Sequence, residues 1–368
     1  MSHLTSAHPL SARYGWDEGF AEAFTPYAAQ GLSPARIVRV DRGRCDVVVP
    51  DRDGVRTAQA DAAPVATGDP LTIMCTGDWA AVDLDRGYVQ ALLPRRSAFV
   101  RSTSSKRSEG QVLAANVDQA VIAVSLAAEL DLGRVERFLA LAWESGAQPL
   151  VVLTKADLVP DPGTLSHLVS DVETAAPGVQ VLPVSGATGE GVDALAAVLA
   201  SGTSVLLGQS GAGKSTLANA LAGEDVQDVQ AIRDSDGKGR HTTTTRDLLP
   251  LPWGGVLIDT PGLRGVGLWD AEDGVGRTFS EIETLAEDCR FADCGHHSEP
   301  GCAVLAAIDA GALPERRLES YRKLLRENAR LAARTDARLR AEMRRDWKQK
   351  QALGRHMLER KGRSVRKP

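Results

Sequence analysis

This chain of 368 residues lacks any apolar run long enough to cross a membrane. A transmembrane helix needs about 20 predominantly apolar residues, and the best candidate, residues 112–130, is interrupted by Asn116 and Asp118. Residues 1–9 are polar and lack the hydrophobic stretch of a signal peptide. We therefore expect a cytoplasmic protein without a membrane partner.

Cysteine is also scarce. The chain has five, an odd number, and three of them fall within residues 289–302, so a disulfide framework is excluded as the basis of the fold. Together with one histidine these three cysteines have the spacing Cys289-x4-Cys294-x-His296-x5-Cys302. Three thiolates and one imidazole make a closed tetrahedral set of the kind that holds structural zinc. Reduced cysteines without a metal are the alternative that the spacing alone leaves open.

What the chain does contain is a complete phosphate-binding loop, GQSGAGKST. It follows an apolar run at residues 203–207 and precedes a helical pattern at 217–221, which is the strand–loop–helix context that the motif requires. In such loops the backbone N–H groups surround the β-phosphate, the lysine reaches the β and γ oxygens, and the serine binds Mg²⁺. We expect nucleotide contacts from Gly208, Gln209, Ser210, Gly211, Ala212, Gly213, Lys214, Ser215 and Thr216.

A guanine-recognition element, TKAD, lies before this loop rather than after it. A carboxylate at Asp157 can accept both the N1–H and the N2–H₂ of guanine, which adenine does not offer. The common form of the element begins with Asn, and Thr154 stands in its place, so one hydrogen bond that braces the loop is left open. Together with the segment VSGATGEG, the predicted base contacts are Thr154, Lys155, Ala156, Asp157, Ser185 and Gly186.

Two more segments follow the phosphate loop, RHTTTT at residues 240–245 and DTPG at residues 259–262. Asp259 is expected to hold Mg²⁺ through water, Thr243 to close on Mg²⁺ and the γ-phosphate, and the Gly262 N–H to meet the γ-phosphate. An ordinary GTPase begins with the phosphate loop and ends with the base-recognition element. The same segments in rotated order identify a circularly permuted GTPase.

The glutamine that orients water in Ras-like GTPases is missing, because Leu263 and Arg264 follow DTPG. His241, at the start of the threonine run, is the best substitute. The catalytic candidates are therefore His241, Thr243 and Lys214. A solvent-facing histidine without a catalytic role is the alternative for His241.

The chain resembles one family, the bacterial ribosome small subunit-dependent GTPases of type A. The segments that carry the resemblance are LPRRSAFVR, QVLAANVDQ, TKADL, GQSGAGKST, GKGRHTTTT, DTPGLRGVGLW and CRFADCGHHSEPGCAV. The resemblance implies an oligonucleotide-binding (OB) barrel, GTP with Mg²⁺, and one structural zinc, and it selects His296 rather than His297 as the fourth zinc ligand. It also implies the small (30S) ribosomal subunit and its rRNA as the partner.

Pattern and resemblance together predict a multidomain fold. Short alternating segments before residue 97, among them LTIMC at 71–75, suit a small β-barrel, which the resemblance makes an OB barrel and the pattern alone leaves open to an SH3-like one. Five apolar runs alternating with helical stretches then indicate an α/β GTPase unit. The expected parts are an extension (1–34), the OB barrel (35–97), the permuted GTPase domain (98–284), a zinc-binding helical domain (285–347) and a basic tail expected to be disordered (348–368).

Charge is distributed unevenly along the chain. The net charge is −5, yet residues 314–368 contain 19 Lys and Arg against 7 Asp and Glu, and a basic arm of this kind favours a polyanionic partner. Its first part, from Leu318, also has helical spacing, so a helix packed on the body is the alternative there. A second basic cluster, with a solvated linker as its alternative, comprises Arg95, Arg96, Arg101, Lys106 and Arg107.

We therefore expect a monomeric GTP hydrolase that acts late in small-subunit assembly, with hydrolysis stimulated by the subunit. One alternative is an RNA-binding scaffold that uses GTP as a structural ligand. Another is a permuted GTPase of large-subunit assembly.

Overall fold

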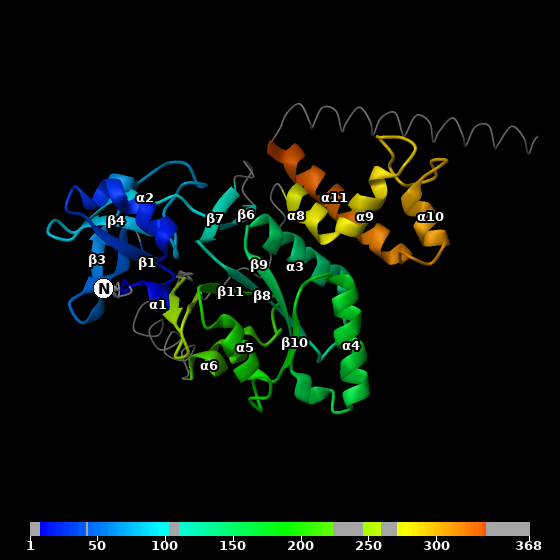
Figure 1. Ribbon diagram of the computed structural model, residues 1–368, viewed down its shortest axis with the longest axis horizontal. Coiled ribbons are helices and arrows are strands. Elements are labelled where there is room, and N and C mark those ends of the chain that lie inside the picture. The colour runs from blue at the N-terminus through cyan, green and yellow to red at the C-terminus, as the bar shows by residue number, and fades with distance from the viewer. Residues whose placement is uncertain (1–7, 42, 103–109, 224–245, 259–270, 336–368) are drawn as a thin grey trace, which may run out of the picture.

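The computed structural model describes residues 8–41, 43–102, 110–223, 246–258 and 271–335 (Figure 1). It has three parts, a β-barrel, a central sheet with its helices, and a C-terminal group of helices. The barrel and the C-terminal helices lie at opposite ends of the central sheet. None of the helices in these ranges is long and apolar enough to cross a membrane.

The N-terminal barrel closes in the strand order β1-β2-β3-β5-β4. Its strands are β1 (Ser33–Asp41), β2 (Arg44–Asp51), β3 (Gly54–Asp61), β4 (Trp79–Asp83) and β5 (Tyr88–Leu92), with a 3₁₀ turn at Ala63–Val65. β1 pairs antiparallel with both β2 and β4, whereas β3 meets β5 in parallel. Five strands in this Greek-key order form an OB barrel, which confirms the expected barrel and excludes the SH3-like alternative.

One expected strand of the barrel is wrong. Residues 71–75 form turns instead of pairing, and Arg95 supplies the physical reason. Its guanidinium donates to the carbonyls of Leu71 (2.8 Å) and Ile73 (2.6 Å), and it forms an ion pair with Asp78. Carbonyl groups that are bonded to a side chain are not available to a sheet ladder.

The N-terminal extension contains two helices, and its last two residues already belong to β1. Helices α1 (Ser11–Tyr14) and α2 (Glu18–Ala28) cover the barrel, and the rings of Trp16 and Phe20 lie 4.9 and 5.5 Å from that of Trp79 on β4. Arg96 forms an ion pair with Asp17 at the start of α2. Arg95 and Arg96 thus each form an ion pair within the fold, Arg95 largely buried and Arg96 47% exposed, and the basic cluster expected around them stays a prediction. Lys106 and Arg107 lie outside the described residues.

The central sheet has the order β10-β9-β8-β11-β13-β12, in which only β12 runs antiparallel. Its strands are β8 (Gln119–Ser125), β9 (Gln148–Thr154), β10 (Val181–Val184), β11 (Thr203–Leu207), β12 (Leu248–Pro250) and β13 (Val256–Ile258). The accompanying elements are α3 (Leu132–Glu144), α4 (Pro162–Ala175), α5 (Val192–Leu199) and α6 (Lys214–Ala222), a 3₁₀ turn (Ala156–Leu158) and the hairpin β6 (Ala98–Ser102) with β7 (Gly110–Ala115). All five predicted strands are present, which confirms the α/β unit.

A buried arginine fastens the barrel to this sheet. Arg36 on β1 is fully buried and donates to the Asn116 carbonyl (3.1 Å) and to Thr203 Oγ1 on β11 (2.8 Å). Its guanidinium lies 4.7 Å from the centre of the Trp79 ring. Burial lowers the pKa of Arg36 to about 10, so the group stays charged at neutral pH.

The C-terminal helices are α8 (Glu272–Thr278), α9 (Ser280–Glu287), α10 (Ala303–Asp309) and α11 (Glu315–Thr335). Helix α8 packs tightly on α3, because a Cβ at Gly274 would lie 2.1 Å from the Ala140 carbonyl. On α11, Leu318, Tyr321 and Leu324 are buried. The first part of the basic arm is thus a helix packed on the body, as its apolar spacing indicated.

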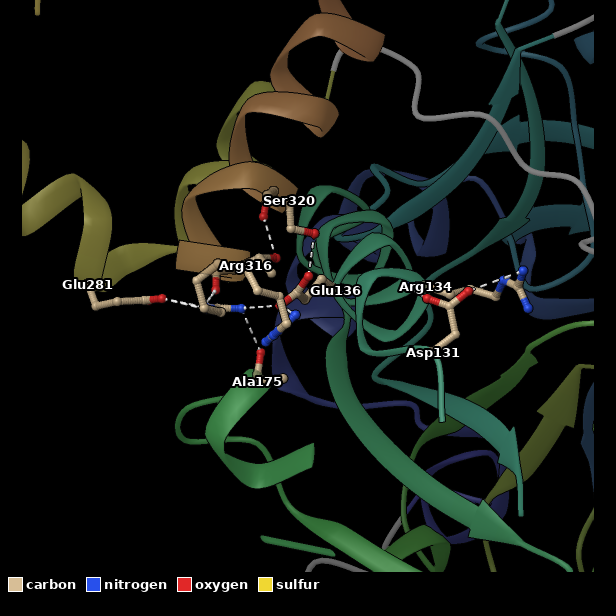
Figure 2. A network of polar contacts seen from close by, with 10 residues as sticks. Asp131, Arg134, Glu136, Ala175, Glu281, Arg316 and Ser320 are labelled. Carbon is tan, nitrogen blue, oxygen red and sulfur yellow. Dashed lines mark hydrogen bonds and ion pairs between the residues drawn. The ribbon is translucent and has the colours of Figure 1, made fainter. Parts of the chain in front are cut away.

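A network around Glu136 joins α11 to the GTPase unit (Figure 2). The Glu136 carboxylate on α3 is fully buried and accepts from Arg316 and Arg317 (both 2.8 Å) and from Ser320. Arg317 also donates to the carbonyls of Ala175 and Thr278 (both 3.0 Å) and pairs with Glu281. One arginine side chain therefore links α3, α4, α8, α9 and α11.

Candidate nucleotide site and metal centre

The phosphate loop connects β11 to α6, as its motif predicts. Gly208 and Gly213 have φ angles of 141° and 80°, which L side chains rarely adopt. A Cβ at Gly208 would also lie 2.5 Å from the Ala123 carbonyl on β8. Lys214 begins α6 and its Nζ donates to the Gly208 carbonyl (2.8 Å), so the ammonium group lies over the loop. Ser215 and Thr216 follow in the first turn of α6 and are exposed.

The base-recognition element lies directly beside this loop. Thr154 ends β9, and its hydroxyl donates to the Ala212 carbonyl in the phosphate loop (2.7 Å). Threonine thus makes a bracing bond that the absence of asparagine had left open. The Ser185 hydroxyl donates to Asp157 Oδ1 (2.6 Å) and accepts from the Thr188 N–H (3.1 Å), which holds the Asp157 carboxylate in place.

A cavity of about 220 Å³ lies where these segments meet. It is lined by Thr154, Lys155, Asp157, Leu158, Gly186, Ala187, Gly213, Thr216 and Leu217. Segments about 60 residues apart in the chain therefore supply one concave site, lined by the Asp157 carboxylate and by Gly213 and Thr216 at the end of the phosphate loop. This donor set fits a guanine nucleotide.

A second cavity, of about 270 Å³, adjoins the phosphate loop on the side of α3. Glu129, Asp131, Arg134 and Phe138 line it together with Gln209 to Ala212. No nucleotide motif marks Glu129, Asp131, Arg134 or Phe138 in the sequence. The only local signal is Asp131, whose side chain accepts from the Arg134 N–H as the N-cap of α3.

Four predicted site residues lie outside the described residues, namely His241, Thr243, Asp259 and Gly262. The residues next to those segments are described. Arg246 and Asp247 precede β12, and Ile258 ends β13 immediately before Asp259.

The cysteine and histidine cluster is assembled as its spacing predicts. One ligand atom from each of Cys289, Cys294, His296 and Cys302 lies within 4.8 Å of the others. The sulfurs of Cys289 and Cys302 are 3.8 Å apart, and His296 Nδ1 is 3.4 Å from Cys302 Sγ. A tetrahedral ion with Zn–S bonds of about 2.3 Å has S···S edges of about 3.8 Å, so the geometry fits zinc.

Contacts around the cluster favour a neutral, oriented histidine. Burial lowers the pKa of His296, and the nearby Arg322 charge lowers it further, which keeps the imidazole neutral as a metal ligand must be. Arg322 donates to the His296 carbonyl and fixes its backbone. His297 is exposed, and its N–H donates to Glu299 (2.6 Å). The fold therefore brings His296 into the cluster and leaves His297 out.

Comparison with known proteins gives a consistent result. The RsgA GTPase family model matches residues 92–269. A protein of Streptomyces coelicolor named small ribosomal subunit biogenesis GTPase RsgA is 71% identical over 358 residues, covering 97% of each chain. The structure resembles YjeQ from Thermotoga maritima with a TM-score of 0.60 and 25% identity, covering 81% of this chain and 98% of that one. It also resembles YloQ, a circularly permuted GTPase, with a TM-score of 0.58, 24% identity and coverage of 81% and 95%. With its guanine element ahead of its phosphate loop and a relative of this identity along nearly its whole length, the chain belongs to the RsgA GTPase family.

Proposed function

We propose that this protein is a GTP hydrolase that acts in a late step of small ribosomal subunit biogenesis. The observation that carries the proposal is the cavity that is lined by both Asp157, which Ser185 holds, and the end of the phosphate loop, which Thr154 braces. A fixed carboxylate selects guanine because an adenine would leave it unpaired in a partly enclosed site. The name of the Streptomyces relative supports the ribosomal step.

Within this proposal each nucleotide-binding residue has a task. Asp157 accepts from the guanine N1–H and N2–H₂, Lys155 lies along the base plane, and the N–H groups of residues 208–216 surround the phosphates. Lys214 exchanges the Gly208 carbonyl for the β and γ oxygens, where its charge stabilises the transferring phosphoryl group.

Ser215 would hold Mg²⁺ together with Thr243 and Asp259, and the ion would neutralise charge that develops on the phosphates. The Gly262 N–H would meet the γ-phosphate. His241 would orient the attacking water, in place of the glutamine that the chain lacks. The roles of His241, Thr243, Asp259 and Gly262, which lie outside the described residues, are assigned from their motif positions alone.

The cluster of Cys289, Cys294, His296 and Cys302 would hold one structural zinc. Four protein ligands leave no open position for chemistry, so the ion would stabilise the C-terminal helices and the loops between them. The nucleotide cavity shares no lining residue with this cluster.

The proposed partner is the small (30S) subunit with its rRNA, which the protein would meet in the cytoplasm as a monomer. The excess of Lys and Arg after residue 314 supports contact with a polyanion. Docking would accelerate hydrolysis.

Turnover of GTP, measured alone and with purified small or large subunits, tests the proposal. We expect small subunits to raise the rate roughly 10²-fold and large subunits to have no such effect. Removing residues 349–368 should weaken subunit binding and flatten its salt dependence while leaving the intrinsic rate intact. His241→Ala should keep binding and lose the stimulated rate. If small subunits do not stimulate the intact protein at low salt, the scaffold function replaces this one.

A further inference from the structure

A loop of the barrel, residues 75–78, contacts the GTPase unit at residues that adjoin two predicted nucleotide-binding segments in the chain, residues 240–245 and 259–262. The Thr76 hydroxyl donates to the Arg246 carbonyl (2.9 Å). Gly77 lies between the Ala115 carbonyl and Ile258, since a Cβ added to it would lie 2.2 Å from that carbonyl oxygen and 3.0 Å from Ile258 Cδ1. Arg246 directly follows the threonine run, and Ile258 directly precedes Asp259. The loop thus bonds to the residue that follows the first segment and lies close to the residue that precedes the second.

A second contact from the barrel reaches the next residue in the chain. Arg39 Nε on β1 lies 3.7 Å from the carboxylate of Asp247. In Figure 1 the yellow-green strands that follow Asp247 lie beside the barrel. Two successive residues, Arg246 and Asp247, are therefore held by the barrel before β12 begins.

The loop that makes these contacts is rigid. The Asp78 carboxylate is fully buried, accepts from the Cys75 N–H (2.8 Å), and takes two charged hydrogen bonds of 2.7 Å from Arg95. The Gly77 carbonyl accepts from Asn116 Nδ2 (3.0 Å). A loop whose polar groups are satisfied in this way has one conformation, so it can serve as a fixed support.

We propose that Thr76 is a positioning residue for GTP hydrolysis and that the barrel is thereby part of the GTPase machinery. The hydrogen bond from Thr76 fixes the position of Arg246 against the barrel. Arg246 follows Thr243, the proposed Mg²⁺ ligand, by three residues in the chain. The inference rests on the proposed GTP hydrolysis but not on its stimulation by a subunit.

The test compares Thr76→Val, which keeps the shape and removes the donor, with Thr76→Ser, which keeps the donor. Thr57→Val, at an exposed position on β3, is the matched control. We expect Thr76→Val to lower kcat about five- to tenfold, the effect of one lost hydrogen bond, with and without small subunits. The KM for GTP and the affinity for GDP should stay unchanged, because Thr76 lines neither cavity. Thr76→Ser should restore kcat.

If Thr76 had a purely structural role, Thr76→Val would lower the thermal stability and raise the KM for GTP. Thr76→Ser would then not restore kcat on its own. An intrinsic kcat for Thr76→Val equal to that of the wild type overturns the proposal. If Thr76→Val does not fold, Arg39→Gln decides, because it removes the ion pair to Asp247 and leaves the loop intact. A several-fold loss of kcat at constant KM is expected for it, and no loss overturns the proposal. A wild type that small subunits do not stimulate would refute the proposed ribosomal function, while the intrinsic rates would still test Thr76.

Discussion

Replacing Arg317 by Gln should loosen the C-terminal helices from the GTPase unit. The side chain is 2% exposed and pairs with Glu136 and Glu281. Removing one partner of a buried ion pair costs about 3–5 kcal/mol, because the remaining charge stays buried without it. Glu136 keeps Arg316 and Ser320 in the variant, so we expect the lower end, about 3 kcal/mol.

Arg134→Gln is the matched control, since Arg134 lies on α3 with Glu136 and Figure 2 shows its side chain directed away from this network. In its ion pair with Asp131, the Arg134 side chain is 44% exposed and the Asp131 side chain 52%. Such surface pairs contribute about 0.5 kcal/mol or less to the free energy of unfolding. Each variant removes one positive charge, Arg134→Gln from α3 and Arg317→Gln from α11. A difference in stability between the two variants therefore reports the burial of the Arg317 ion pairs.

Hydrogen exchange followed by mass spectrometry is the suitable assay, because a chain of several domains does not unfold in one step. A loss of 3 kcal/mol should speed exchange of the α11 amides by about 10²-fold, while amides of β9 and β11 stay protected. Full protection of α11 in Arg317→Gln would refute the reasoning. Equal loss in Arg134→Gln would show that net charge, and not the buried network, is responsible.

Three further changes test the two sites. Asp157→Asn should weaken GTP binding and shift preference toward xanthine nucleotides, since the amide can donate to the O2 that replaces N2–H₂. Competition binding measures this, and a wild type that binds ATP and GTP equally would contradict the assignment. Thr154→Val should weaken binding of GTP and GDP alike by about fivefold through loss of the bond to Ala212, with Thr154→Ser as its control. Cys294→Ser should lose the single zinc and thermal stability but keep GTP binding, and metal analysis that finds no zinc in the wild type would refute the metal assignment.

Local chemistry made the nucleotide site predictable. The phosphate loop and the TKAD element carry their function in short runs of residues, and strands buried on both faces have continuous apolar sequence. The structure brings together Asp157, Ser185 and the phosphate loop as the motifs indicated. The ligand spacing around Cys302 likewise predicted a cluster that is assembled in the fold.

Contacts between distant residues were not predictable in this way. Arg317 meets Glu136 across 181 positions, and Thr76 meets Arg246 across 170, so neither pair leaves a periodic or local pattern. The same reason explains the wrong strand at residues 71–75. Its apolar alternation is that of a strand, but Arg95, some 20 residues later, takes its carbonyl groups.

The two buried arginines have a consequence for selectivity. Arg36 fastens the barrel to the start of β11, and Arg317 fastens the C-terminal helices to α3 and α4, so these two ends of the molecule are both anchored to the GTPase unit, which sets their separation. When both ends contact one partner, the second contact forms at high effective concentration only if the partner presents its two sites at that same separation. A partner whose sites are spaced differently is held at one end alone and gains no avidity. Bivalent binding through a rigid body thus measures the shape of the partner, which gives an assembly factor a means of distinguishing a correctly folded particle from an incomplete one.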